Sequence, residues 1–244
     1  MVQKHRRLIW LRAAAALMLV AIVVGTVGWW HLRHWQPPRA VFAMQGVEIG
    51  STDVAATTAN DNANNASVDW TALKAIGADF AYIDASAGAF AHDPDFSRNL
   101  EEARATGLQV GAVHRYDPCQ PADKQAANFV TVVPRDSKML PPAVELAQLA
   151  TDCPVRVSDA SVESELMTFL NEIETHTGKA SLLKISPAFE SRYHLARAID
   201  RNLWLMGNRF QPDYAQRPWT LWTANDALQT TAMDKPLRWV VVQP

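Results

Sequence analysis

The stretch FAYIDASAGAFAHDPDFSRNLEEARATGLQVGAVH, residues 80–114, decides the fold class of this chain. Residues 80–83 form an apolar run that is typical of a buried strand. Residues 94–106 have the pattern of a helix, and Gly107 follows as a stop signal. Residues 108–114 then return to an apolar strand. A strand, a helix and a second strand in this short distance predict two parallel strands joined by a crossover helix.

The same alternation continues along the rest of the chain. Further strands are predicted at residues 41–49, 143–146, 180–185, 203–206, 219–222 and 239–242, and further helices at 69–76, 122–132 and 161–176. The segment 52–67 consists almost wholly of Thr, Ala, Asn and Asp, so it has too little apolar surface to pack and is predicted to be a loop. About five strand–helix units followed by extra strands favour a barrel over an open doubly wound sheet.

The N-terminal 43 residues form a separate unit. Residues 13–30 carry no charge, and as a helix they are long enough to cross the hydrocarbon core of a membrane. Basic residues gather before this segment, at Lys4, Arg6, Arg7 and Arg12, and only Arg33 and Arg39 follow it at a similar distance. This asymmetry predicts a cytoplasmic N-terminus (1–12), a linker (31–43) and an exported domain (44–244). The alternative is a cleaved signal peptide.

Composition and short motifs narrow the classes of function. A formal net charge of −2 gives no support for nucleic-acid binding, which normally requires a basic face. The chain has no GxGxxG, GxxxxGK[ST], HExxH or GxSxG motif, so we predict no cofactor and no metal. Cys119 and Cys153 are a candidate disulfide in an oxidising compartment, or else two unrelated thiols.

Eight short motifs follow one another in a characteristic order. Gly46-Val47-Glu48-Ile49 looks like an opening strand of the pattern Gly-(Val/Ile)-Asp-Val-Ser. The others are Val68-Asp69-Trp70 with Gly77 to Ile83, Ala85-Ser86 with Gly88, Gly107 to Tyr116, Gln125 to Phe129, Leu140 to Glu145, Leu203 to Leu205, and Pro218 to Trp222. Together, from Gly46 to the C-terminus, they resemble glycoside hydrolase family 25, the lysozymes or N-acetylmuramidases. The resemblance implies an α/β fold, a modified TIM-type (β/α) barrel.

The resemblance also implies a pair of carboxylates as catalytic groups. A retaining glycosidase needs a proton donor and an anionic group, and this family takes both from a strand that ends Asp-x-Glu. The two side chains point to the same face of the strand. Here the strand reads Glu145-Leu146-Ala147, so the first carboxylate is kept and alanine replaces the acid. Glu48 and Asp84, expected on neighbouring strands, are the candidates for a displaced acid, and crowding beside Glu145 should raise at least one pKa.

Five further residues are candidates for substrate binding by the same resemblance. His114 and Tyr116 match positions that the family keeps, although His114 is also typical of a satisfied core histidine. Trp204 and Trp222 are either a sugar-stacking wall or barrel core. Asp234 stands loosely where the family has a late acidic residue.

The predicted barrel also bears on the two cysteines. Cys119 follows the strand of His114, and Cys153 follows the strand of Glu145. Neighbouring barrel strands place both cysteines in loops on the same face, so we predict that they form a disulfide.

Two hypotheses of different classes follow. The first is a single-pass protein of the bacterial inner membrane whose periplasmic or extracellular domain is lysozyme-like and acts on peptidoglycan. The family reaction is hydrolysis of the β-1,4 bond between N-acetylmuramic acid and N-acetylglucosamine. The second is a pseudoenzyme, an inactive glycan- or protein-binding scaffold of the cell envelope on the same fold. Ala147 favours the second hypothesis on activity, and the sequence favours neither on the ligand.

Overall fold

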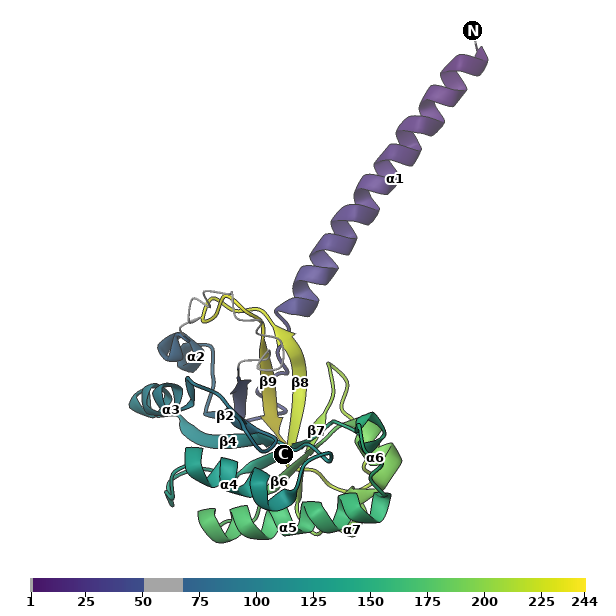
Figure 1. Ribbon diagram of the computed structural model, residues 1–244. Coiled ribbons are helices and arrows are strands. Elements are labelled where there is room, and N and C mark those ends of the chain that lie inside the picture. Colours follow the sequence, from purple (N-terminus) through teal and green to yellow (C-terminus); the bar gives the residue numbers. More distant parts are fainter. Residues whose placement is uncertain (1, 51–67) are drawn as a thin grey trace. The chain divides into compact units, whose positions relative to one another are not determined.

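The structure, a computed structural model, describes residues 2–50 and 68–244. The chain divides into two compact units, Met1–Trp35 and Gln36–Pro244 (Figure 1). The low-complexity segment 52–67 lies outside the described residues, so its loop conformation stays a prediction.

The first unit is one helix, α1 (Val2–Arg33). Its apolar part, Ala14–Arg33, has 20 residues with a mean hydropathy of 1.9, and none of it is buried. Length and composition fit a membrane span and a signal sequence equally well. The sequence predicted a basic segment 1–12 ahead of a helix at 13–30, whereas the structure continues a single helix through both.

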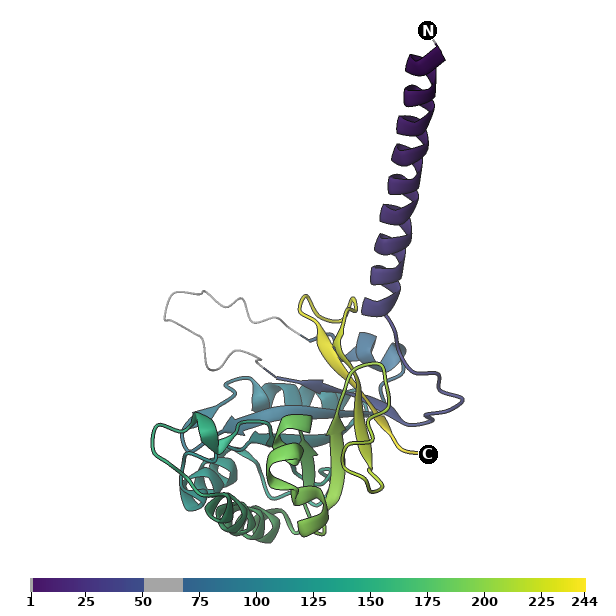
Figure 2. The same ribbon diagram turned by 90° about the vertical axis from the view of Figure 1, so that its right-hand side faces the viewer.

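The second unit is an eight-stranded closed barrel within the described residues (Figure 2). The strands follow the order β1-β9-β8-β7-β6-β5-β4-β2, and β1 pairs with β2 to close the ring. Strand β9 runs antiparallel to β1 and β8, and the other barrel neighbours are parallel. Strand β3 (Ala91–His92) extends β2 as a short hairpin. The barrel strands are β1 (Gln45–Ile49), β2 (Phe80–Ala87), β4 (Gln109–Arg115), β5 (Ala143–Leu146), β6 (Leu182–Ile185), β7 (Asn202–Met206), β8 (Leu221–Leu228) and β9 (Leu237–Val242). The predicted α/β barrel is therefore confirmed.

Helices lie on the outside of the barrel, around the strands other than β8 and β9 (Figure 1). They are α2 (Trp70–Ala75), α3 (Phe96–Ala105), α4 (Ala122–Val132), α5 (Asp159–Thr177), α6 (Pro187–Tyr193), α7 (Leu195–Ala198) and the 3-10 turn η1 (Ala150–Asp152). The sequence predicted α2 to α5 but none of α6, α7, η1 or β3, which are too short to show a clear period. The strand predicted at 219–222 begins at Leu221 and runs to Leu228, because β8 continues as a hairpin with β9.

The interior of the barrel is a packed core. Its inward-facing cluster consists of Phe80, Tyr82, Val113, Ala143, Leu182, Trp204, Leu221 and Val240. Space is tight, since a Cβ on Gly46 would overlap the ring of Phe80. We call the end of the barrel at which the parallel strands have their C-terminal ends the mouth. Because side chains alternate along a strand, the position two residues further towards the mouth faces inward again. The next inward layer is the one that carries the charged residues of the site.

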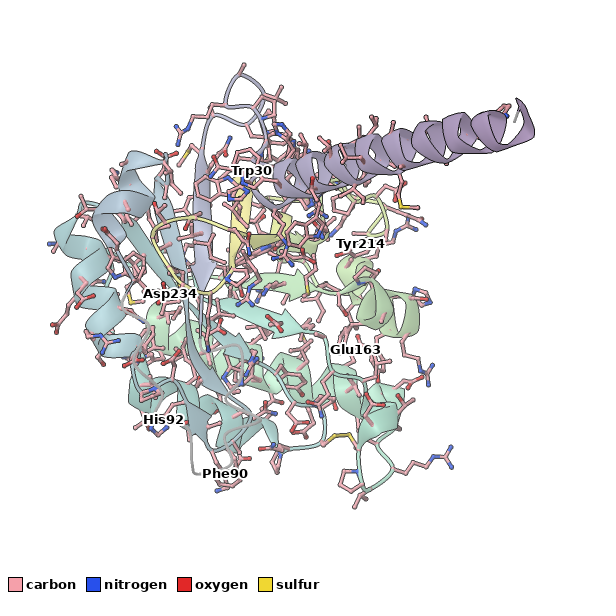
Figure 3. All side chains as sticks on the ribbon, turned by 90° about the horizontal axis from the view of Figure 1, so that it is seen from above. Trp30, Phe90, His92, Glu163, Tyr214 and Asp234 are labelled. Carbon is pink, nitrogen blue, oxygen red and sulfur yellow. A yellow bond between two sulfur atoms is a disulfide. The ribbon has the colours of Figure 1, made fainter. Side chains whose placement is uncertain are left out.

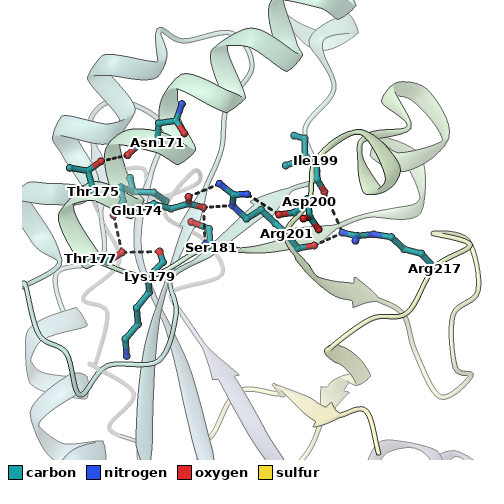
Figure 4. Close-up of polar contacts among 11 residues, drawn as sticks. Asn171, Glu174, Thr175, Thr177, Lys179, Ser181, Ile199, Asp200, Arg201 and Arg217 are labelled. Atoms are coloured by element: carbon teal, nitrogen blue, oxygen red, sulfur yellow. Dashed lines mark hydrogen bonds and ion pairs between the residues drawn. The ribbon is translucent and has the colours of Figure 1, made fainter.

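Polar contacts link helix α5 to the end of the barrel that lies away from the mouth (Figure 4). Two nitrogens of Arg201 each lie 2.7 Å from an oxygen of the Glu174 carboxylate. The backbone N–H of Ser181, just before β6, donates to the same carboxylate at 2.9 Å. Burial works against ionisation of Glu174, but the hydrogen bonds from Arg201 and Ser181 outweigh it and hold its pKa below the usual value. These contacts fix the N-terminal ends of β6 and β7, which lie away from the mouth.

Candidate active site

Six charged side chains form the inward layer above the core, which we call the mouth layer. They are Glu48 of β1, Asp84 of β2, Arg115 of β4, Glu145 of β5, Lys184 of β6 and Arg238 of β9. Each lies two residues along its strand from a residue of the interior, for example Glu145 after Ala143 and Lys184 after Leu182. The three predicted carboxylates are thus brought together, and three cations that the sequence analysis did not single out join them.

Two of these cations bind the carboxylates directly. The Nζ of Lys184 donates to Glu48 and, at 2.5 Å, to Glu145. The Nε of Arg238 lies 2.9 Å from Glu48, and its Nη2 lies 3.6 Å from Asp84. Lys184 and Glu48 are each 1% exposed, so the ion pair between them is shielded from water and its electrostatic interaction is strong.

This burial separates the pKa values of the acids. It raises the pKa of Asp84 to about 7; the cation of Arg238 opposes the rise, and the neighbouring carboxylates reinforce it. Burial also acts against ionisation of Glu48, but Arg238 and Lys184 outweigh it and hold the pKa of Glu48 below its usual value. The sequence predicted a raised pKa for at least one of the crowded carboxylates, and the structure places this raised pKa at Asp84. A Cβ on Gly50 would overlap the Asp84 carboxylate, so glycine leaves it room.

A pocket of about 370 Å³ opens beside Glu145. Its lining consists of Ala87, Gly88, Ala91, Arg115, Tyr116, Asp117, Gln120, Glu145, Ala147 and Gln148. Position 147 faces the same space as Glu145, and its methyl group has no proton to donate. Asp117 accepts hydrogen bonds from the backbone of Cys119 and from Gln120 and Gln148 at 2.5–2.9 Å, which hold the surrounding loop.

Of the five predicted substrate-binding residues, one lines the pocket and the other four lie elsewhere. Tyr116 lines the pocket. His114 is fully buried on the outward side of β4, where its Nδ1 lies 2.8 Å from the Ser86 hydroxyl and its ring packs 4.6 Å from that of Phe169. Burial lowers its pKa to about 4. The binding role predicted for His114 is corrected to a structural one, because alternation along β4 turns residue 114 away from the mouth.

The aromatic wall is corrected in the same way. Trp204 is fully buried, and its indole N–H donates to Thr223 at 2.9 Å. Trp222 is also buried and packs against Phe42 and Trp219. These indoles have no ring face open to a sugar: Trp204 belongs to the barrel core, and Trp222 is buried on the outer side of β8.

Asp234 and the cysteines lie on loops around the mouth. Asp234 is exposed on the connection between β8 and β9 and does not line the pocket (Figure 3). Cys119 and Cys153 form a disulfide, as predicted, with their Cα atoms 5.2 Å apart. This bond joins the loop after β4 to the loop after β5, the two strands that flank the pocket. Among the described residues, no group of three or more His, Cys, Asp or Glu is placed to hold a metal ion.

Comparison with known proteins places this site in a family. The family model described as glycosyl hydrolases family 25 matches residues 61–232, more than half of the chain. The chain belongs to glycosyl hydrolase family 25. Among solved structures, it resembles a family 25 glycosyl hydrolase from Bacillus anthracis with a TM-score of 0.72 and 25% identity, over 88% of this chain and 94% of that one. It also shares the fold of a lysozyme from Streptomyces coelicolor, with a TM-score of 0.68 and 18% identity, over 82% and 92% of the two chains.

The matches to curated relatives cover less of the molecule. The uncharacterized protein YegX of Escherichia coli (strain K12) is 27% identical over 162 residues. The match covers 65% of this chain and 57% of the relative, so it spans little more than half of that protein's length.

The sequence analysis identified the acidic residues of this family 25 site but missed its positively charged residues. Lys184 stands in Leu182-Leu183-Lys184-Ile185, an otherwise apolar strand, and Arg238 stands between Leu237 and Trp239. A charged residue at the inward position of a buried strand requires a partner of opposite charge. Three inward carboxylates and an inward lysine were therefore a signal for ion pairing across the mouth.

Proposed function

We propose that this family 25 domain binds glycan strands of peptidoglycan in the pocket beside Glu145, without cleaving them by the family's acid-assisted route. The observation that carries the proposal is the buried Lys184, whose Nζ lies 2.5 Å from Glu145. A retaining glycosidase needs one carboxyl group that gives a proton and a second anionic group that stabilises the sugar cation. Here Ala147 has no proton to give, and the negative charge of Glu145 is compensated by the ion pair with Lys184.

The shape of the site supports a saccharide as the ligand. A pocket of about 370 Å³ falls within the range that small ligands occupy. Gln120 and Gln148 place amide groups along its wall, and these groups suit the hydroxyl and acetamido groups of an amino sugar. Membership of family 25 supports peptidoglycan as the source of that saccharide.

A second candidate function is hydrolysis with Asp84 as a displaced acid. A carboxyl group with a pKa of about 7 is partly protonated at neutral pH, as a general acid must be. Asp84 lines a small hollow that shares Ala87, Ala91 and Arg115 with the main pocket. In this alternative Glu145 would stabilise the sugar cation.

For the setting of the domain, we propose that α1 stays attached as a single-pass anchor in the bacterial inner membrane. The excess of basic residues before the apolar segment supports a cytoplasmic N-terminus and a periplasmic or extracellular barrel.

The test uses the full-length protein in detergent with purified peptidoglycan sacculi, and measures both co-sedimentation and release of reducing ends. The native chain is expected to sediment with sacculi and to release nothing above the blank. The double variant Ala147→Glu with Lys184→Met is expected to gain release, and the further change Glu145→Gln should abolish it. Lys74→Met, an exposed lysine on α2, is the matched control.

The possible results separate the two functions. Release by the native chain that disappears in Asp84→Asn would establish the second candidate in place of the first. Folded protein that neither sediments with sacculi nor releases reducing ends would rule out both.

A further inference from the structure

Arg115 is the third cation of the mouth layer, and its surroundings differ from those of the other two. It is the last residue of β4 and is partly buried. Its side chain lines both the main pocket and the small hollow that contains Asp84. It lies between His114, which is buried on the outer side of the strand, and Tyr116, which lines the same pocket.

The acids of the mouth layer are engaged elsewhere. Glu145 is the register neighbour of Arg115 on β5, but its carboxylate pairs with Lys184 instead. Glu48 contacts Lys184 and Arg238, and Asp84 faces Arg238. Within residues 2–50 and 68–244, the ion pairs of the mouth include none made by Arg115. Because Glu145 pairs with Lys184, Arg115 lines the pocket without an ion-pair partner among the described residues.

A partly buried arginine in the wall of a pocket, without an ion-pair partner among the described residues, is suited to bind an anion. Its parallel N–H groups match the two oxygens of a carboxylate, and such charge-assisted hydrogen bonds are about twice as strong as neutral ones. Ala87 and Ala147, on either side of this part of the pocket, leave room for a substituent that branches from a sugar ring.

We infer that Arg115 binds a carboxylate carried by the glycan, so that the pocket selects acid-bearing glycan strands over neutral ones. This inference rests on the proposed glycan binding and specifies the class of glycan. In peptidoglycan the carboxylate has two sources, the lactyl group of muramic acid and the stem peptide attached to it. The lysine and arginine that neutralise the mouth carboxylates make this selection possible, because they reduce the repulsion that an anionic ligand would meet.

The experiment is calorimetric titration of the full-length protein in a detergent without a sugar headgroup. Three ligands are compared: neutral chitotetraose, a muramic acid-containing tetrasaccharide with free lactyl groups, and the same tetrasaccharide carrying stem peptides. We expect the native chain to bind an acid-bearing ligand at least about ten-fold more tightly than chitotetraose. Arg115→Gln should weaken that binding about ten- to a hundred-fold and leave the affinity for chitotetraose unchanged. Arg115→Lys should keep part of the preference, since it keeps the charge without the fork.

The outcomes show which group supplies the carboxylate, and they separate a failure of this inference from a failure of the proposed glycan binding. A preference for the peptide-free ligand assigns the lactyl group, and a preference only for the peptide-bearing ligand assigns the stem peptide. Equal affinity of the native chain for neutral and acidic ligands, or an equal loss for both in Arg115→Gln, would overturn this inference while leaving glycan binding in place. No binding of any saccharide by the folded native chain would overturn the proposed function as well. Arg192→Gln, on α6 and paired with Asp159, is the control arginine.

Discussion

At the scale of single residues, Lys184 is the counter-ion that allows two carboxylates to be buried side by side. Glu48 and Glu145 come from strands on different sides of the barrel, and one ammonium group bridges them. Burial favours the neutral amine, but the two carboxylates outweigh it and raise the pKa of Lys184 above its usual value. The lysine is therefore held in its charged form at neutral pH.

Removal of that charge should be costly. Lys184→Met leaves two acids near each other without their shared cation, and breaking a buried ion pair from one side costs about 3–5 kcal/mol of unfolding free energy. Adding Glu48→Gln removes one of the orphaned charges, so the double variant should regain much of the loss. Urea unfolding followed by circular dichroism measures both values. A loss below about 1 kcal/mol in Lys184→Met, the size of a surface ion pair, would show that the bridge is not formed in solution.

Asp84 gives a dependence on pH whose sign follows from its shifted pKa. Its pKa is about 7 when folded and 3.8 in a model compound. Between roughly pH 4 and pH 7 the folded chain keeps a proton that the unfolded chain has released, so stability falls as pH rises through this window. His114, with its pKa lowered to about 4, acts in the opposite direction below its model value of 6.5. A comparison of a variant with its parent cancels the histidine contribution.

Asp84→Asn should remove the acid's contribution alone. The unfolding free energy of the variant minus that of the native chain is expected to rise by a few kcal/mol from about pH 4 to pH 7 and to stay level above. Chemical unfolding at half-unit steps of pH measures it, with Asp123→Asn on the exposed face of α4 as the control. A difference that does not change with pH would show that Asp84 titrates normally.

At the scale of elements, the alternation of strands and helices was readable because each long element has a clear period. Helix α4 has the predicted bounds, and α5 differs from the prediction by only two residues at its start and one at its end. The short α6 and α7 lack such a period, so the sequence did not predict them. The side chains that face the mouth were harder still to predict. Inward and outward positions on β4 follow from strand register, which a single sequence does not give, so His114 was placed in the site and Arg115 was overlooked.

The loops after β4 and β5 depend on their disulfide. Cys119 and Cys153 are 34 residues apart, and closing a loop of that length stabilises the folded chain by about 4 kcal/mol in the chain-entropy account. The double variant Cys119→Ala with Cys153→Ala should lose about that amount, measured by urea unfolding. Because Gln148 contacts both Asp117 and Cys119 beside the pocket, glycan binding should weaken too. Reduction of the native chain should reproduce the loss of stability and leave the variant unchanged; an effect of reductant on both would point to another cause.

At the scale of the whole molecule, the described chain consists of two units, which contain α1 and the barrel. Helix α1 has an exposed apolar segment with no role in the barrel core, and the barrel holds the pocket and its charged layer. A pocket whose chemistry favours retention of a glycan strand over turnover would gain from attachment to a surface. An uncleaved anchor would turn such a domain into a link between the membrane and the wall, whereas a cleaved signal would release it.

That difference can be measured on the native chain with a C-terminal tag. If α1 is the proposed anchor, the tagged chain stays at full length, sediments with membranes and resists extraction with alkaline carbonate, because a helical segment of 20 residues with a mean hydropathy of 1.9 is long and apolar enough to span the hydrocarbon core. Protease added to spheroplasts should then remove the tag, since the proposed topology places the barrel outside the cytoplasm. Changing Val20 and Val24 in the middle of the apolar segment to Arg should release the chain from carbonate-washed membranes, because each charge at the centre of a span costs about 2.5–3.5 kcal/mol. A shortened soluble chain outside the cytoplasm would establish a cleaved signal, and a tag protected from protease in intact spheroplasts would reverse the proposed topology.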